Sequence, residues 1–72
     1  MGFDPKHVVE LARTIKQSRP TVGEAKRMLV AAGYIGRVVK EDGMDYEGSS
    51  DHRVNRVNIE LIQGRVVDAY VG

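Results

Sequence analysis

Apolar residues recur at helical spacing near the start of the chain, where a first helix is expected. Four of them fall every three or four positions and leave one apolar stripe: Val8, Leu11, Ala12 and Ile15. Proline is tolerated in the first turn of a helix, whereas the residue before a proline is pushed away from helical dihedrals. The pattern therefore predicts a helix over residues 5–17 that begins at Pro5 and is prevented from continuing by Arg19-Pro20.

A second apolar stripe follows a capping motif. In Thr21-Val22-Gly23-Glu24 the threonine hydroxyl and the glutamate carboxylate can each satisfy a free amide at a helix start. The stripe that follows consists of Ala25, Met28, Leu29 and Ala32. Gly33 stands where a left-handed helix cap belongs, so the second helix is predicted over residues 22–32.

Strand patterns occupy the rest of the chain on both sides of a polar segment. Residues 34–40 are predicted to form a strand, and 53–62 alternate between two faces, as in a half-buried strand. The apolar face of the second strand carries Val57, Ile59 and Leu61, and its polar face carries Arg56, Asn58 and Glu60. Gln63-Gly64 fits a two-residue turn into residues 65–71, whose Val67, Ala69 and Val71 are expected to share a face.

Residues 41–51 are rich in Asp, Gly and Ser and have no period, which predicts a surface loop. The order helix, helix, strand, loop, strand, strand indicates one α+β domain over residues 1–72. We expect a small mixed sheet of three strands packed by one helix, with an additional N-terminal helix.

Length and composition favour a binding protein over an enzyme. A chain of 72 residues buries only about 60% of its unfolded surface, so its core is thin and offers few rigid walls for a catalytic cleft. Eleven basic and ten acidic side chains give a net charge of +1, which argues against nucleic acid or a membrane as partner. There is no cysteine, and no cofactor is expected.

The expected cellular compartment depends on whether a signal peptide has been removed from the chain. The start Met1-Gly2-Phe3-Asp4-Pro5 lacks the basic and apolar regions of a signal peptide, and no segment has the apolar length of a membrane span. The chain as given is therefore expected in the cytoplasm, or outside the cell if a signal peptide has been removed.

Two groupings of polar residues invite a chemical interpretation, and the spacing argues against both. Ser49-Ser50-Asp51-His52 holds hydrolase residue types, but neighbours in an extended chain point to opposite faces and cannot converge. The acids Asp42, Asp45, Glu47 and Asp51 do not follow the ligand spacing of an EF-hand, so no metal site is expected. His7 is expected to be exposed on the first helix.

Five segments carry a resemblance to a known family: Thr21-Val22-Gly23-Glu24-Ala25-Lys26, Arg37-Val38-Val39, Asp51-His52-Arg53-Val54-Asn55-Arg56-Val57-Asn58-Ile59, Gly64-Arg65-Val66-Val67 and Val71-Gly72. Together they resemble the potato inhibitor I family of serine-protease inhibitors. The likeness covers residues 20–72 and leaves residues 1–19 as an N-terminal helical extension. Arg56-Val57-Asn58 is most similar to the microbial elastase-inhibitor branch.

The resemblance implies a mechanism and a set of site residues. The two strands that flank the loop would be parallel, and residues 44–53 would enter a protease cleft as a substrate does. This binding loop consists of Met44, Asp45, Tyr46, Glu47, Gly48, Ser49, Ser50, Asp51, His52 and Arg53. Ser50 and Asp51 would flank the scissile bond, with Arg56 bracing Asp51 and Asn58 at the second supporting position. The expected partner is a serine protease of subtilisin, elastase or chymotrypsin type.

A second hypothesis is a protein-interaction module without inhibitory activity. The loop is longer than in the family, and Gly48 adds freedom where the inhibitors place a stiff residue. Such a module would use the first helix or an exposed sheet edge to hold another protein or, as a homo-oligomer, a second copy of itself. Met44 lies in a polar segment and is either tucked under the loop or offered to a partner.

Overall fold

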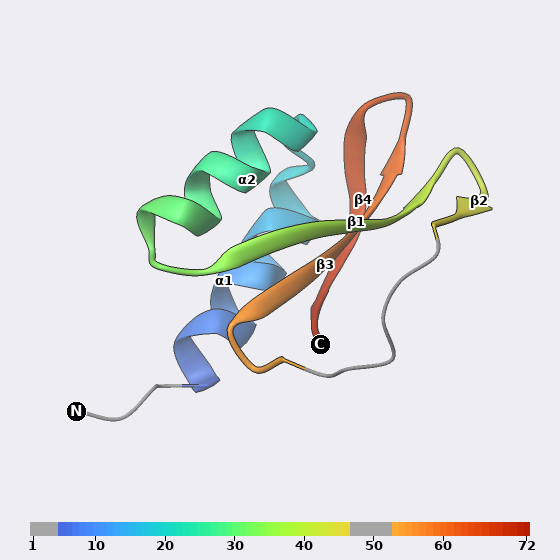
Figure 1. The fold of residues 1–72 in the computed structure, drawn as a ribbon. Helices are drawn as coiled ribbons and strands as arrows, with labels where there is room; N and C mark the ends of the chain where they lie inside the picture. The colour runs from blue at the N-terminus through green and yellow to red at the C-terminus, as the bar shows by residue number, and fades with distance from the viewer. Residues whose placement is uncertain (1–4, 47–52) are drawn as a thin grey trace.

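The computed structural model describes residues 5–46 and 53–72 and shows a small α+β domain with two helices and a four-stranded mixed sheet (Figure 1). The elements are α1 (Pro5–Ser18), α2 (Val22–Ala31), β1 (Ile35–Glu41), β2 (Met44–Asp45), β3 (Arg56–Ile62) and β4 (Arg65–Val71). The α+β class is therefore confirmed, with one strand more than the sequence pattern predicts.

The helix boundaries follow from local chemistry. At the start of α2, Thr21 Oγ1 accepts a hydrogen bond from the Glu24 N–H at 3.3 Å, and Glu24 Oε1 accepts one from the Thr21 N–H at 3.3 Å. At its end Gly33 takes φ +85°, and the Tyr34 N–H donates to the Leu29 carbonyl oxygen at 2.8 Å. The predicted capping box and glycine cap are both confirmed.

The core lies between the helices and one face of the sheet. From α1 it takes Val8, Ala12 and Ile15, and from α2 it takes Ala25 and Leu29. Tyr34 and the strand residues Val57, Ile59, Leu61, Val66 and Ala69 complete it. Burying an aliphatic side chain stabilises a fold by about 1.5–3 kcal/mol, so α1 contributes to the stability of this domain.

The sheet has the order β2-β1-β3-β4, with β1 parallel to β3 and the other two pairs antiparallel (Figure 1). Ile35 pairs with Arg56 at one end of the parallel ladder, and Glu41 pairs with Leu61 at the other. The expected parallel arrangement of the two strands that flank the loop is thus confirmed. Gly36 lets α2 approach β1, because a Cβ there would lie 3.0 Å from Leu29 Cδ1.

The sequence pattern predicted a surface loop over residues 41–51, whereas the structure shows a hairpin over residues 41–45. Asp42 and Gly43 have φ of +51° and +82° and make a tight turn, after which β2 pairs Met44 with Glu41 and Asp45 with Lys40. Asp-Gly is a strong signal for a two-residue hairpin turn, since both central residues need positive φ. Gln63 and Gly64, with φ of +51° and +77°, form the predicted turn of the same kind.

The alternation predicted for the last two strands fails in two places. The register shift opposite Glu60 and Leu61 leaves Val67 as an extra residue in β4, so Val66 rather than Val67 enters the core with Ala69. At the start of β3 the polar face is buried as well as the apolar one. The prediction of a half-buried strand is therefore wrong there.

No helix in the described parts of the chain is long and apolar enough to cross a membrane.

Candidate functional site

The parallel pairing of β1 and β3 determines where the two ends of the inter-strand connection lie. β1 ends at Glu41 and β3 begins at Arg56, at opposite ends of the ladder. A strand of seven residues is about 23 Å long. The two ends of the connection are therefore about one strand length apart, and the connection, residues 42–55, contains the whole predicted binding loop.

The structure describes the two flanks of the predicted loop. Met44, Asp45 and Tyr46 follow the Asp42-Gly43 turn, and Arg53 precedes β3. The loop residues Glu47, Gly48, Ser49, Ser50, Asp51 and His52 lie outside the described residues, and with them the presumed scissile pair. The contact predicted between Arg56 and Asp51 falls outside them for the same reason.

The N-terminal flank is tied to the sheet by backbone and side-chain bonds. The Asp42 N–H donates to the Leu61 carbonyl oxygen at 2.9 Å, and Asp42 Oδ1 accepts from the Gln63 N–H at 2.7 Å. The Tyr46 N–H donates to the Val39 carbonyl oxygen at 3.0 Å. This side of the connection is thus held to β1 and to the β3–β4 turn.

The side chains of this flank point outward. Met44 is 74% exposed and Tyr46 is 54% exposed. The Tyr46 hydroxyl donates to Glu41 Oε1, and this bond to a carboxylate raises the pKa of Tyr46, with a smaller effect from the Asp42 charge. Of the two alternatives for Met44, the structure shows the exposed one.

Arg56 begins β3 as a buried cation. It is only 7% exposed, and its Nε donates to the Gly72 carbonyl oxygen at 2.9 Å. The Gly72 N–H donates in return to the Arg56 carbonyl oxygen at 3.0 Å. These two bonds fasten the last residue of the chain to the strand that leaves the predicted loop.

Asn58 is the second buried polar residue, two positions further along the same face. It is 5% exposed, and its Oδ1 accepts from Arg37 Nε at 3.3 Å and from Arg37 Nη2 at 3.1 Å. Arg37 and Asn58 are register partners on the parallel strands β1 and β3. The two predicted supporting residues, Arg56 and Asn58, thus each form a hydrogen-bonded pair on this face, Arg56 with Gly72 and Asn58 with Arg37. We call these four residues, Arg37, Arg56, Asn58 and Gly72, the polar layer.

Sequence reasoning did not assign Arg37 and Gly72 to this layer. Both residues stood in segments that resemble the inhibitor family, yet nothing local links position 37 with 58 or 56 with 72. The partners follow only from the strand registers, in which β1 places Arg37 beside Asn58 and β4, with Val71 opposite Val57, places Gly72 beside Arg56. Among the described residues no buried side-chain nitrogen or oxygen lacks a hydrogen-bond partner.

The residues considered for catalysis or metal binding do not cluster within the described parts of the chain. His7 is exposed, as predicted, and its Nδ1 lies 2.7 Å from the hydroxyl of Tyr34. Within residues 5–46 and 53–72 no group of three or more His, Cys, Asp or Glu side chains is placed to hold a metal ion. Asp42 and Asp45 are described, whereas Glu47 and Asp51 are not.

Comparison of the chain with protein-family models, with curated proteins and with solved structures found no match.

Proposed function

We propose that this protein inhibits serine proteases, presenting residues 44–53 to the active-site cleft in the manner of a substrate. The proposal joins the resemblance to the potato inhibitor I family with one structural observation, the polar layer at the start of β3. A binding loop that carries no disulfide needs a rigid base, because a loop that is already ordered loses less conformational entropy on binding and so binds more tightly.

The polar layer has the properties of such a base. Arg56 and Asn58 are almost completely buried, although strand residues of these types are usually exposed. Each is held by a directional bond, Arg56 to Gly72 and Asn58 to Arg37. A hydrogen bond that involves a charged group contributes about 1.5–3 kcal/mol, so the strand that follows the loop is held firmly.

The N-terminal flank supports the same proposal. The turn at Asp42 is bonded to Leu61 and Gln63, so the connection starts from a position that is tied to β3. Exposed Met44 and Tyr46 would then lie at the entrance of the loop, where they are available to contact a protease. In this proposal Ser50 fills the specificity pocket, and its small size suits the shallow pockets of elastase and subtilisin types.

The test is titration of the protein against subtilisin, elastase and chymotrypsin, with Ser50→Leu and Ser50→Pro variants. If Ser50 occupies the specificity pocket, Ser50→Leu shifts the preference from elastase towards chymotrypsin by roughly 10- to 100-fold, since each buried methylene is worth about 1–3 kcal/mol in a pocket. Ser50→Pro abolishes inhibition. Ser18→Leu is the matched control, because Ser18 is exposed on α1 and lies outside the loop.

Two results would contradict the proposal. One is the absence of inhibition of all three enzymes at micromolar protein, and the other is rapid, complete cleavage between residues 44 and 53. Either result would favour the second hypothesis, a non-inhibitory interaction module built on the same scaffold. If the protein inhibits but Ser50→Leu leaves the protease preference unchanged, inhibition stands and the assignment of Ser50 to the specificity pocket is wrong.

A further inference from the structure

A groove between α1 and β4 has no role in the proposed inhibition. Its volume is about 270 Å³, and it is lined by the apolar Val9, Ala12, Tyr70 and Val71 together with the basic Arg13 and Lys16. Val9 is 45% exposed and Tyr70 is 43% exposed, so this apolar surface faces solvent. We call this site the α1/β4 groove.

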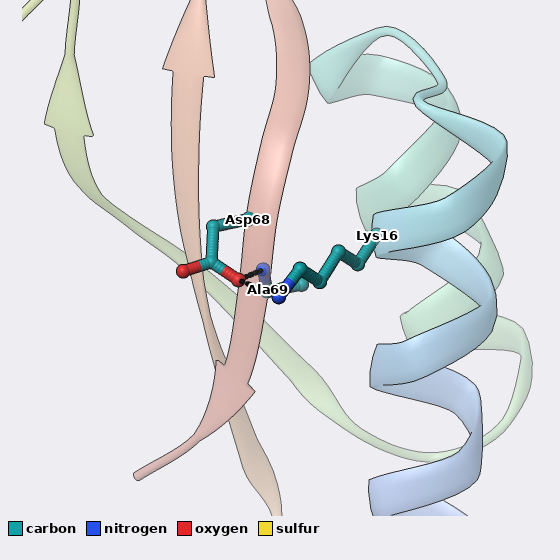
Figure 2. A network of polar contacts seen from close by, with 3 residues as sticks. All are labelled: Lys16, Asp68 and Ala69. Carbon is teal, nitrogen blue, oxygen red and sulfur yellow. Dashed lines mark hydrogen bonds and ion pairs between the residues drawn. The ribbon is translucent and has the colours of Figure 1, made fainter.

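The edge of the sheet at this groove is blocked against an added strand. β4 is an edge strand, and because the Gly72 N–H donates to β3, the alternating pattern directs the Ala69 N–H outward. Asp68 Oδ1 accepts that N–H at 2.9 Å, and Lys16 Nζ lies 3.3 Å from the same oxygen. Figure 2 shows the three residues and both contacts. A partner in the groove must therefore bind through side chains and not by extending the sheet at Ala69.

The opposite edge of the sheet carries an acidic surface, whose charge is complementary to the basic residues of the groove. The hairpin of residues 41–46 presents Met44 at 74% exposure and Tyr46 at 54%. Around them stand the carboxylates of Glu41, Asp42 and Asp45. We call this segment the acidic hairpin.

One chain cannot bring its own hairpin to its own groove. The strand order β2-β1-β3-β4 places the acidic hairpin at one edge of the sheet, and β4, which lines the groove, forms the other edge. A groove-to-groove dimer would bring Arg13 and Lys16 of two copies together, and like charges in contact oppose binding. The acidic hairpin of a second copy brings the opposite charge and two exposed apolar side chains.

We propose that the protein self-associates head to tail, with the acidic hairpin of one copy in the α1/β4 groove of the next. Such an interface is heterologous, so it generates open chains or rings and not only dimers. It is small, and interfaces at the low end of the size range are weak and transient. Salt screens exposed charges beyond about 10 Å at 0.1 M, so association should weaken as salt increases.

Sedimentation equilibrium from micromolar to millimolar protein, at low and high salt, tests this proposal. The average mass should increase with concentration past that of a dimer, and the increase should diminish at high salt. Arg13→Glu and Asp45→Arg should each weaken association about fivefold, since exposed charge pairs contribute up to about 1 kcal/mol. Combining both changes in one chain, or mixing the two variants, should restore association because the charges are then opposite again.

Arg27→Glu is the matched control. It makes the same charge change at an exposed position of α2, outside the groove, and should leave association unchanged. Arg13 and Asp45 are also exposed, so circular dichroism should show that all three variants are folded. Asp68→Asn frees Lys16 from its ion pair and keeps an acceptor for Ala69, so it should strengthen association about twofold.

Three outcomes would overturn the proposal. The wild-type protein could stay monomeric at millimolar concentration and low salt, Arg13→Glu could behave as Arg27→Glu does, or the double variant could fail to recover association. In a nuclear magnetic resonance dilution series, shifts at Val9 and Tyr70 without shifts at Met44 and Tyr46 would identify a groove-to-groove dimer or another occupant instead.

Discussion

The first four residues of β3, from Arg56 to Ile59, are buried on both faces of the strand, and the two faces are stabilised by different interactions. Towards the helices, Val57, Ile59 and Leu61 pack into the apolar core. On the opposite face, Arg56 and Asn58 are almost as deeply buried, but each is satisfied by hydrogen bonds within the polar layer. One face of the strand is thus stabilised by close packing, and the other by hydrogen bonds that depend on direction.

The difference determines how each face should respond to substitution. Apolar packing is non-directional and scales with the area removed from water, so a smaller side chain costs in proportion to the cavity it leaves. A buried polar group that loses its partner costs its full desolvation, whatever the remaining packing. The apolar face therefore sets most of the stability, and the polar layer sets the position of the strand that follows the predicted loop.

The largest effect is expected on the apolar face. Ile59→Ala should lower the free energy of unfolding by about 2–5 kcal/mol, because Ile59 is fully buried and truncation leaves a cavity. Urea unfolding followed by circular dichroism measures it. Ile62→Ala on the same strand, at a residue 53% exposed, should change stability by no more than about 0.5 kcal/mol. Equal losses in the two variants would contradict this account of the core.

The next effect is expected in the polar layer. Arg56→Met keeps most of the side-chain volume but removes the donor to Gly72, and should cost about 1.5–3 kcal/mol of unfolding free energy. Under the proposed function it should also weaken protease inhibition, measured by titration at a temperature where the variant is folded. Arg27→Met, at an exposed position, is the control. Full stability of Arg56→Met would show that the bond to Gly72 contributes nothing net.

A smaller effect measures one bond of the layer directly. A double-mutant cycle with Arg37→Ala and Asn58→Ala should give a coupling free energy of about 1 kcal/mol, because the two side chains share two contacts at 3.1 and 3.3 Å. A second cycle that combines Asn58→Ala with Arg27→Ala should show no coupling. If the first cycle also gives none, the two side chains lie side by side without mutual stabilisation.

The smallest effect concerns the start of α2. Hydrogen bonds from the side chain and backbone of Thr21 lower the pKa of Glu24 below its ordinary value of 4.5, with Arg65 and Arg27 adding to the shift. A lowered folded-state pKa gives stability that is present above 4.5 and is lost as the pH falls through the lower value. Melting temperatures between neutral and strongly acid pH should therefore decrease more in the wild type than in Glu24→Gln. Parallel curves would contradict this linkage.

The amino-acid sequence by itself determined the elements whose signals are local. The helical stripe from Val8 to Ile15, the capping box at Thr21, the cap at Gly33 and the Gln63-Gly64 turn all depend on residues within a few positions of one another. The physics of helix ends and tight turns acts over that range. The hairpin at Asp42-Gly43 carried an equally local signal, which the polar composition of residues 41–51 obscured.

Only the tertiary structure decided what depends on register. The bulge at Val67 put Val66 into the core in place of Val67, and the pairing of β1 with β3 put Arg37 beside Asn58, on a face that is buried at Arg56 and Asn58 although alternation predicted it to be open. It also placed the acidic hairpin and the α1/β4 groove at opposite edges of the sheet. The paired residues are far apart in the chain, and a one-residue change of register would alter these pairs and the buried positions without changing any local pattern.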